Sequence, residues 1–482
     1  MGLATDWIAR NVSRFRSTDA AAPAAKKEGV DAPKAAVPRS MAQRLQATLR
    51  RGEEVLSPRE LRKLMEDLQA AADASLSDVE GGRHAQQLMH WHAQAELPAR
   101  KELWTLIIDQ FGPDAEALLA ARKRYDTAAS DAERGHAEMD LRRALMSPRT
   151  RLLQRFAQPQ AGMGFLVDLR AQLLALPKAE QPRFAALDAE LEHLFSSWFD
   201  VALLELRRLS WDSPASLIEK LIEYEAVHDI RSWADLKNRL DSDRRCYGLF
   251  HPRMPSVPLI FVEVALVDKM SDSIAPLLDE AAAAADLERA TTAIFYSISN
   301  TQTGLRGVSF GDSLIKHVVQ TLTREFPRLR HFATLSPIPG LRAWIARHGD
   351  AVLEKMDERL RKAFAQEAGG MGAEHLLAAL EAPQSLPPDA PVRRALLFCA
   401  AHYLGRETTK GRPLDPVARF HLGNGARVER LNWAADLSPK GLKQSLGLMV
   451  NYLYDLKRLD KHRGLLAQGR IPVSPDIDAL CK

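Results

Sequence analysis

From about residue 39 to about residue 195, apolar residues recur at the three-to-four-residue spacing of helices that bury one face. Almost no run of β-branched residues interrupts this pattern. One helix start is marked by Ser57, Pro58 and Glu60, which stand where an N-cap, a first helical proline and a capping-box carboxylate are expected. The pattern predicts an all-α domain over residues 39–195, with helical stretches centred on ELWTLIIDQF, AEALLAARKRY, MDLRRALM, GFLVDLRAQLLAL and AALDAELEHLFSSWF.

Beyond residue 195 the pattern changes, because runs rich in β-branched and aromatic residues begin to alternate with helical stretches. Residues 312–326 carry apolar residues at helical spacing, and Pro327 ends that pattern. Strands that alternate with helices predict a mixed α/β domain over residues 196–482. The runs that predict strands are residues 258–267, 292–299, 330–336 and 427–436.

Two parts of this second domain have patterns of their own. Residues 341–417 predict a mostly helical insertion, which the proline-rich segment PQSLPPDAP interrupts. Near the end of the chain, Ser438 and Pro439 mark a helix start, and apolar residues then recur at 4-3-4-3 spacing up to Leu456. This spacing predicts a helix in which Tyr454 lies one residue from the buried stripe, at the edge of the core.

The first 38 residues are unlike the rest and predict a disordered tail and linker. Trp7, Ile8 and Phe15 stand among arginines, a weak sign of an organelle-import helix, although a bacterial N-terminal tail fits the segment better. The alanine-, proline- and lysine-rich residues that follow cannot bury a core. We therefore expect a cytoplasmic bacterial protein, with the mitochondrial matrix as the alternative.

Composition argues against several classes of protein. Hydrophobic residues make up 46% of the 482 and charged residues 27%, a balance typical of globular domains. No run approaches the ~18 apolar residues of a membrane span. The first fifty residues hold nine basic and four acidic side chains, so the remainder is close to neutral and does not favour nucleic-acid binding. Three cysteines without metal-ligand spacing predict a reduced protein without structural disulfides.

Residues 306–312 carry the strongest local sign of ligand binding. A turn of small residues leads directly into an amphipathic helix, and free N–H groups at such a helix start suit a pyrophosphate. Arg306, Ser309 and Gly311 resemble the Arg/Gln-x-x-Gly-x-Gly/Ala loop with which GNAT-type acyltransferases hold coenzyme A. Residues 307–311 also fit the G-x-S-x-G motif of α/β-hydrolases, but a polar segment separates Ser309 from the preceding strand. The coenzyme A interpretation involves Arg306, Gly307, Val308, Ser309, Phe310, Gly311 and Asp312.

Three neighbouring histidines suggest a metal site, but helix geometry argues against it. His84 and His90 stand about 240° apart around a helix, and His90 and His92 about 200° apart. Because the three cannot share one face, surface or packing histidines are the better interpretation. We expect no metal site.

Five segments together give the chain a specific resemblance. From about residue 40 onward it resembles the malonyl-CoA decarboxylases, in long ungapped stretches that contain rare residues. The stretches are WDSPASLIEKLIEYEAVH (211–228), RRCYGLFH (244–251), AIFYSISNTQTGLRGVSFG (293–311), REFPRLRHFATLSPIPG (324–340) and FHLGNGARVERLNWAADLSPKGLKQSLGLMVNYLY (420–454).

The resemblance implies an N-terminal helical domain for homo-oligomerisation, as a dimer or tetramer, followed by a GNAT-like catalytic domain. It implies conversion of malonyl-CoA to acetyl-CoA and CO2, with Ser336 of the LSPIPG motif, His421 of the FHL-NGA motif and Tyr454 of the NY-Y motif as site residues. Residues 306–312 correspond to the family's coenzyme A loop. Some members carry an acid where this chain has Ser309, so a catalytic role is not transferred to that position.

The chemistry of this reaction agrees with what the sequence offers. Loss of CO2 leaves an enolate whose electron sink is the thioester carbonyl, so the reaction needs no metal and no cofactor. The protein must hold the carboxylate, stabilise the oxyanion and protonate the α-carbon. We expect His421 to donate the proton and Ser336 to fix the carboxylate, although the two roles are exchangeable. The alternatives are a thioester hydrolase that uses Ser309, a GNAT-type acyltransferase and a non-catalytic helical scaffold.

Overall fold

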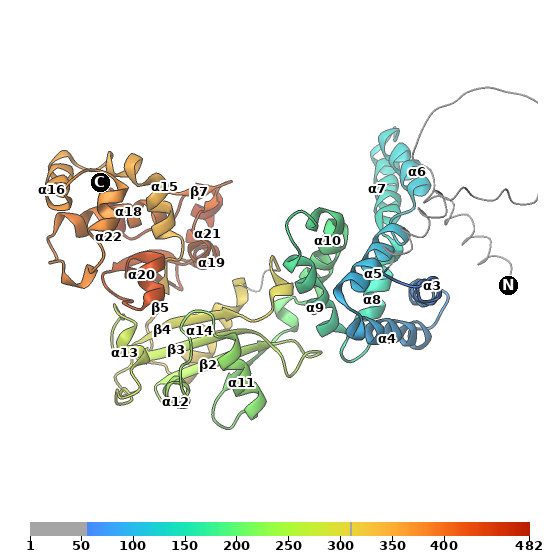
Figure 1. Cartoon of the computed structure of the whole chain (residues 1–482), viewed down its shortest axis with the longest axis horizontal. Coiled ribbons are helices and arrows are strands. Elements are labelled where there is room, and N and C mark those ends of the chain that lie inside the picture. The colour runs from blue at the N-terminus through green and yellow to red at the C-terminus, as the bar shows by residue number, and fades with distance from the viewer. Residues whose placement is uncertain (1–54, 309–310) are drawn as a thin grey trace, which may run out of the picture. The chain divides into compact units, whose positions relative to one another are not determined.

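The computed structural model describes residues 55–308 and 311–482 (Figure 1). The tail and linker predicted for residues 1–38 lie outside the described residues, as do residues 39–54 at the start of the predicted helical domain. Within the described ranges, no helix is long and apolar enough to cross a membrane.

Helices fill the described chain from Pro58 to Trp198, as the spacing of the apolar residues predicts. The predicted capping box is confirmed: Ser57 Oγ accepts the Glu60 amide at 3.2 Å, and the Glu60 carboxylate accepts the Ser57 amide at 3.0 Å. The core between these helices contains the fully buried Trp104 and Phe195. The helices are α3 (Pro58–Ala72), α4 (Asp78–Gln94), α5 (Leu97–Gln110), α6 (Ala115–Asp126), α7 (Asp131–Leu145), α8 (Pro148–Ala157), α9 (Gly162–Ala175) and α10 (Gln181–Trp198).

An eight-stranded mixed sheet forms the centre of the region that follows. Neighbouring strands run in the order β1-β2-β3-β4-β5-β10-β6, and β9 pairs with β10. Antiparallel pairs join β1 through β4, and β5 lies parallel to β4 after a crossover through α14 (Gly311–Glu325). The strands are β1 (Glu205–Leu209), β2 (Arg244–Phe250), β3 (Pro258–Val267), β4 (Thr292–Asn300), β5 (His331–Thr334), β6 (Ser336–Pro337), β9 (Arg427–Asn432) and β10 (Met449–Leu453).

Helices connect these strands and extend the domain beyond the sheet. The helices after β1 are α11 (Ala215–Tyr224), α12 (Trp233–Arg239) and α13 (Ala275–Leu278), and after β6 come α15 (Leu341–Leu353), α16 (Glu358–Ala368), α17 (Ala373–Ala378), α18 (Pro391–Gly405), α19 (Pro416–Gly423), α20 (Pro439–Ser445), α21 (Leu459–Ala467) and α22 (Pro475–Leu480). A two-stranded hairpin, β7 (Thr408–Thr409) with β8 (Arg412–Pro413), lies between α18 and α19. The predicted order, an all-α region followed by a mixed α/β domain, is therefore confirmed.

The sheet opens where β4 and β5 stop pairing. Only the first half of β4, up to Phe295, pairs with β5, whose last paired residue is Thr334. From there to Asn300, β4 continues against β3 alone, after a register shift opposite Glu263 and Val264. The chain beyond β5 turns away and forms β6, where Ser336 lies opposite Val450 of β10. This opening in the sheet sets the position of the candidate site.

The helix predicted over residues 438–456 is wrong beyond its first two turns. Ser438 does cap α20, but Leu446 and Gly447 adopt positive φ values of 56° and 82°, and the chain continues as strand β10. Residues 448–450 are all buried because β10 lies inside the sheet, with both faces covered. A strand that is buried on both faces has no period-2 pattern, and its leucines therefore fitted a helical stripe by chance.

Candidate active site

Helix α19 holds His421 in its last turn, inside the domain. Asp415 caps this helix, because its Oδ1 accepts the amides of Val417 and Ala418, both at 2.9 Å. The Asp415 carboxylate also accepts the hydroxyl of Tyr403 at 3.2 Å, which ties the helix start to α18. The His421 side chain is only 4% exposed. Its imidazole therefore depends on neighbouring side chains for hydrogen bonds.

Two hydrogen bonds join the imidazole to the other two predicted site residues. His421 Nε2 lies 3.3 Å from Ser336 Oγ, and His421 Nδ1 lies 2.7 Å from the hydroxyl of Tyr454. Tyr454 follows β10 directly, and its amide donates to the Phe332 carbonyl at 2.9 Å. The structure thus brings Ser336, His421 and Tyr454, which are far apart in sequence, into one buried chain of hydrogen bonds.

Ser336 is fixed by the strand end in which it stands. Its hydroxyl donates to Thr334 Oγ1 at 2.8 Å, and Pro337 holds it in extended backbone geometry. The side chain is 6% exposed. Ser336 therefore presents its oxygen to His421 from the point where β4 and β5 part.

Burial determines the charge state of the site. It lowers the pKa of His421 to about 3, because a positive charge on the buried ring would lose its solvation. It also raises the pKa of the Tyr454 hydroxyl above its ordinary value, for the same reason. Near neutral pH, therefore, His421 is a neutral imidazole and Tyr454 a neutral phenol. The contacts between these residues are therefore hydrogen bonds between neutral groups, not ion pairs.

Three further residues belong to this site and were not predicted from the sequence. The ring of Tyr452 stacks on His421 at 4.7 Å with an interplanar angle of 27°. Thr334 Oγ1 accepts the Ser336 hydroxyl, and the side-chain amide of Asn451 donates to the Thr334 carbonyl. Extended backbone places residues i and i+2 on one face, so the Tyr-Leu-Tyr run of residues 452–454, at the end of β10 and just beyond it, was a usable sign. The wrong helix prediction for this segment hid it.

The loop predicted to bind coenzyme A is described only in part. Ser309 and Phe310 lie outside the described residues, and so does the side chain of Asp312. The hydrolase interpretation of Ser309 therefore has no structural test. Gly307 adopts a φ of +90°, which favours glycine, and α14 begins at Gly311. Arg306, Gly307 and Val308 share no hydrogen bond with the three site residues in the part of the chain that the structure describes.

A buried arginine of the helical region supports this loop. Arg170 of α9 is 1% exposed, and its Nη1 donates to the carbonyls of Gly304 and Arg306 at 2.9 Å and 2.7 Å. Its charge is balanced by Asp188, at 2.8 Å, and by Glu192. A Cβ on Gly304 would lie 1.9 Å from the carbonyl oxygen of Val167 in α9. The start of the loop is thus built directly onto α9 and α10.

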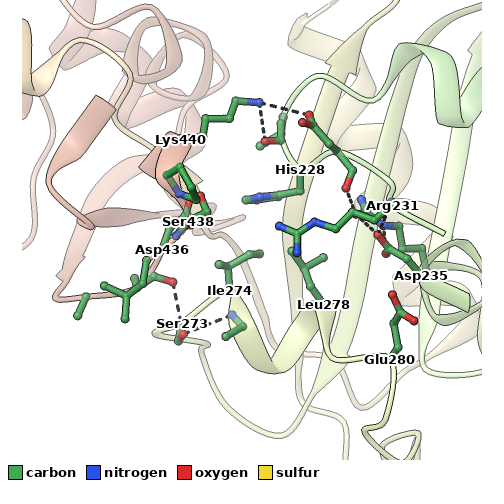
Figure 2. A pocket seen from close by; sticks show the side chains of 18 residues that line it. His228, Arg231, Asp235, Ser273, Ile274, Leu278, Glu280, Asp436, Ser438 and Lys440 are labelled. Atoms are coloured by element: carbon green, nitrogen blue, oxygen red, sulfur yellow. Dashed lines mark hydrogen bonds and ion pairs between the residues drawn. The ribbon is translucent and has the colours of Figure 1, made fainter. Parts of the chain in front are cut away.

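A cavity of about 580 Å³ lies elsewhere in this domain, and Figure 2 shows the side chains that line it. Ile274 and Ala435, which line it, pack with Met449, whereas Tyr452 and Tyr454 belong to the core on the opposite face of β10. None of the predicted site residues lines this cavity, so the sequence motifs and the cavity mark different places.

The three histidines considered as metal ligands have separate surroundings. His84 Nδ1 lies 2.8 Å from Asp67, and His92 is buried and accepts the indole N–H of Trp104 at 3.2 Å. His90 lies 3.0 Å from the amide of Gln94. Among the described residues, no group of three or more histidine, cysteine, aspartate or glutamate side chains is placed to hold a metal ion.

Comparisons with known proteins agree on one family. Sequence profiles of the malonyl-CoA decarboxylase N-terminal and C-terminal domains match residues 111–199 and 202–482. The mitochondrial malonyl-CoA decarboxylase of Mus musculus is 36% identical over 406 residues, which cover 78% of this chain and 80% of that protein. The enzyme of the same name from Anser anser anser is 35% identical over 400 residues, again 78% of this chain and 78% of that protein.

Solved structures give the same result. A malonyl-CoA decarboxylase from Cupriavidus metallidurans is 42% identical, with a TM-score of 0.70 over 88% of this chain and 100% of that chain. One from Rhodopseudomonas palustris is 38% identical, with a TM-score of 0.74 over 86% of this chain and 98% of that chain. The chain belongs to the malonyl-CoA decarboxylase family.

Proposed function

We propose that this chain, a carboxy-lyase by family, converts malonyl-CoA to acetyl-CoA and CO2 at Ser336, His421 and Tyr454 without a cofactor. The observation that carries the proposal is the buried series of hydrogen bonds from Tyr454 through His421 to Ser336. It joins one group that can hold a carboxylate to two groups that can deliver a proton. No other function has a specific observation in its favour.

The reaction itself sets what these residues must do. Breaking the bond between the carboxylate carbon and the α-carbon leaves its electron pair on the α-carbon, delocalised onto the thioester oxygen as an enolate. One proton then forms the methyl group of acetyl-CoA. Because the thioester carbonyl accepts the electrons, the protein has to supply orientation, polar stabilisation and that proton.

Ser336 is the residue that we assign to the malonyl carboxylate. Its hydroxyl is the outermost member of the hydrogen-bonded series and stands where the sheet opens. On binding, the hydroxyl hydrogen turns from Thr334 Oγ1 to a carboxylate oxygen, which holds that group in one orientation. The absence of an acidic hydrogen-bond partner for Ser336 among the described residues suits this role, since an acid there would repel the substrate.

His421 is the residue that we assign to the proton transfer, as a neutral imidazole. Burial keeps the pKa of its ring at about 3, so the ring is uncharged when substrate arrives. The enolate takes the proton of Nε2, and the Tyr454 hydroxyl passes its own proton to Nδ1 across 2.7 Å. A proton from solvent then adds to Nε2 while Nδ1 returns its proton to Tyr454, which restores the starting tautomer and balances the one proton that each turnover consumes.

Coenzyme A binding is assigned to residues 306–312, for which the support is the loop's position at the start of α14. Backbone N–H groups at a helix start bind pyrophosphate well, and Gly307 lets the backbone approach a ligand closely. The dimer or tetramer and the cytoplasmic location expected from the sequence stay predictions.

The pH dependence of the reaction tests the neutral-histidine assignment. With the pKa of His421 at about 3, the ring stays neutral at every pH above 5, and kcat/KM is expected to stay constant within about twofold from pH 6 to pH 8. A charged imidazolium donor with an ordinary pKa near 6.5 is lost as the pH rises, so kcat/KM would then fall about tenfold per pH unit above that value. Initial rates with malonyl-CoA at constant ionic strength distinguish the two cases.

A further inference from the structure

Thr334 occupies a special position beside the site, although no hydrogen bond joins it to the imidazole in the described structure. It is 1% exposed and ends β5. Its Oγ1 accepts two hydrogen bonds, from the hydroxyl of Ser336 at 2.8 Å and from the amide of Tyr452 at 3.1 Å. A hydroxyl oxygen has two lone pairs, and both are used here. Thr334 is therefore the fixed acceptor for the single hydroxyl hydrogen of Ser336.

This contact determines how Ser336 meets His421. With its hydrogen given to Thr334, Ser336 Oγ acts only as an acceptor toward Nε2, which lies 3.3 Å away. The hydrogen in that contact must then come from Nε2. A neutral imidazole carries one ring hydrogen, so Nδ1 is an acceptor and receives the hydroxyl hydrogen of Tyr454 at 2.7 Å. One tautomer satisfies all three contacts.

We infer that Thr334 is a positioning residue that keeps the proton of His421 on Nε2, the nitrogen from which the substrate is protonated. The inference rests on the proposed function of His421, and it adds a residue that acts on the imidazole through Ser336 and not by a hydrogen bond of its own. Thr334 accepts the hydroxyl hydrogen of Ser336 and so keeps it away from Nε2, until a malonyl carboxylate binds and accepts it instead.

The surroundings of Thr334 are built to hold it still. Its carbonyl accepts the side-chain amide of Asn451 at 2.7 Å, and Asn451 is completely buried and accepts a hydrogen bond from Asn432 at 2.8 Å. The backbone amide of Tyr452 donates to Thr334 Oγ1, and the Tyr452 ring stacks on His421. Tyr452 therefore contacts both Thr334 Oγ1 and the imidazole of His421, so strand β10 fixes the position of one relative to the other.

Without the Thr334 hydroxyl, the opposite tautomer becomes the favoured one. In Thr334→Val the Ser336 hydrogen has no acceptor except Nε2, so the ring hydrogen moves to Nδ1 and the Tyr454 hydroxyl loses its acceptor. The substrate then meets a ring whose Nε2 has no proton to give, so a change of tautomer has to precede each protonation. We expect kcat to fall roughly 10-fold or more, while KM for malonyl-CoA stays within about threefold.

The test combines kinetics with a direct view of the tautomer. Full-length protein is labelled with ¹⁵N-histidine, the His421 signals are assigned by their loss in His421→Asn, and substrate-free spectra are recorded for wild type, Thr334→Val and Thr334→Ser. We expect a protonated Nε2 in wild type, an unprotonated Nε2 in the valine variant, and a return of both kcat and the protonated Nε2 with serine. Thr334→Ala replaces the valine variant if valine prevents folding.

A double-mutant cycle separates positioning from mere structural support. If Thr334 acts through the Ser336 hydroxyl, Thr334→Val should lower kcat much less in a Ser336→Ala background than in wild type. Effects that multiply in the double variant, or an unprotonated Nε2 in the wild-type spectrum, would overturn the inference. Normal turnover by His421→Asn would instead overturn the proposed function, and the tautomer measured in the spectra would be unaffected by that result.

Discussion

Replacement of His421 by asparagine is expected to lower kcat by roughly 10²–10⁴-fold, the typical loss when an acid–base group is removed. Asparagine keeps a polar group of similar reach inside the same pocket, but its amide does not exchange protons at the required rate. KM for malonyl-CoA should change little, because the described part of the loop assigned to coenzyme A shares no hydrogen bond with His421. Steady-state rates with malonyl-CoA measure both constants.

A second buried histidine provides the matched control. His462 of α21 is 5% exposed, close to the value for His421, and its Nδ1 lies 3.0 Å from the Gly425 carbonyl. His462→Asn removes a buried imidazole from the same domain but leaves the chain of hydrogen bonds to Ser336 intact. It should lower stability without a comparable loss of kcat. Equal losses of kcat in the two variants would mean that His421 serves only the fold.

Replacement of Arg170 by methionine is expected to lower the free energy of unfolding by about 3 kcal/mol. The change leaves Asp188 and Glu192 without their partner and frees the carbonyls of Gly304 and Arg306. The value lies at the lower end for a broken buried ion pair, because Asp188 and Glu192 are 31% and 46% exposed and regain contact with water. Urea unfolding followed by circular dichroism measures it.

The same substitution should weaken substrate binding, because Arg170 supports the loop assigned to coenzyme A. We expect KM to rise roughly tenfold, which equals about 1.4 kcal/mol of binding free energy. Arg149 is the matched control: it is also buried in the helical region and paired with Glu190, but it does not contact residues 303–308. Arg149→Met should lower stability and leave KM unchanged. An unchanged KM in both variants would refute the support of the loop by α9.

The fold class followed from the sequence because its two regions bury their apolar residues differently. Amphipathic helices show a period, and the first region consists of them. Strands β1 and β2 were not predicted, since β1 is rich in charged residues and β2 is buried on both faces and shows no alternation. The error at β10 has the same cause. The position of each segment in the sheet determined its secondary structure, and the local sequence pattern does not contain that position.

The residues of the candidate site were predicted from the sequence, but the contacts that join them were not. Ser336, His421 and Tyr454 came from a family resemblance, and the local pattern alone placed Tyr454 only at the edge of the core. Their joining depends on pairs such as Val450 with Ser336, which only the sheet establishes. The role of Thr334 was not predicted for the same reason, because it depends on the hydrogen bond that Thr334 Oγ1 accepts from Ser336 at the end of the strand.

The central claim is that this chain decarboxylates malonyl-CoA with its own side chains. The most direct measurement is incubation of purified protein with malonyl-CoA in the presence of a chelator and without added cofactor, with the thioester products identified by mass spectrometry. Acetyl-CoA and CO2 in equal amounts are the predicted result. Free coenzyme A with malonate, or unchanged malonyl-CoA, would contradict it.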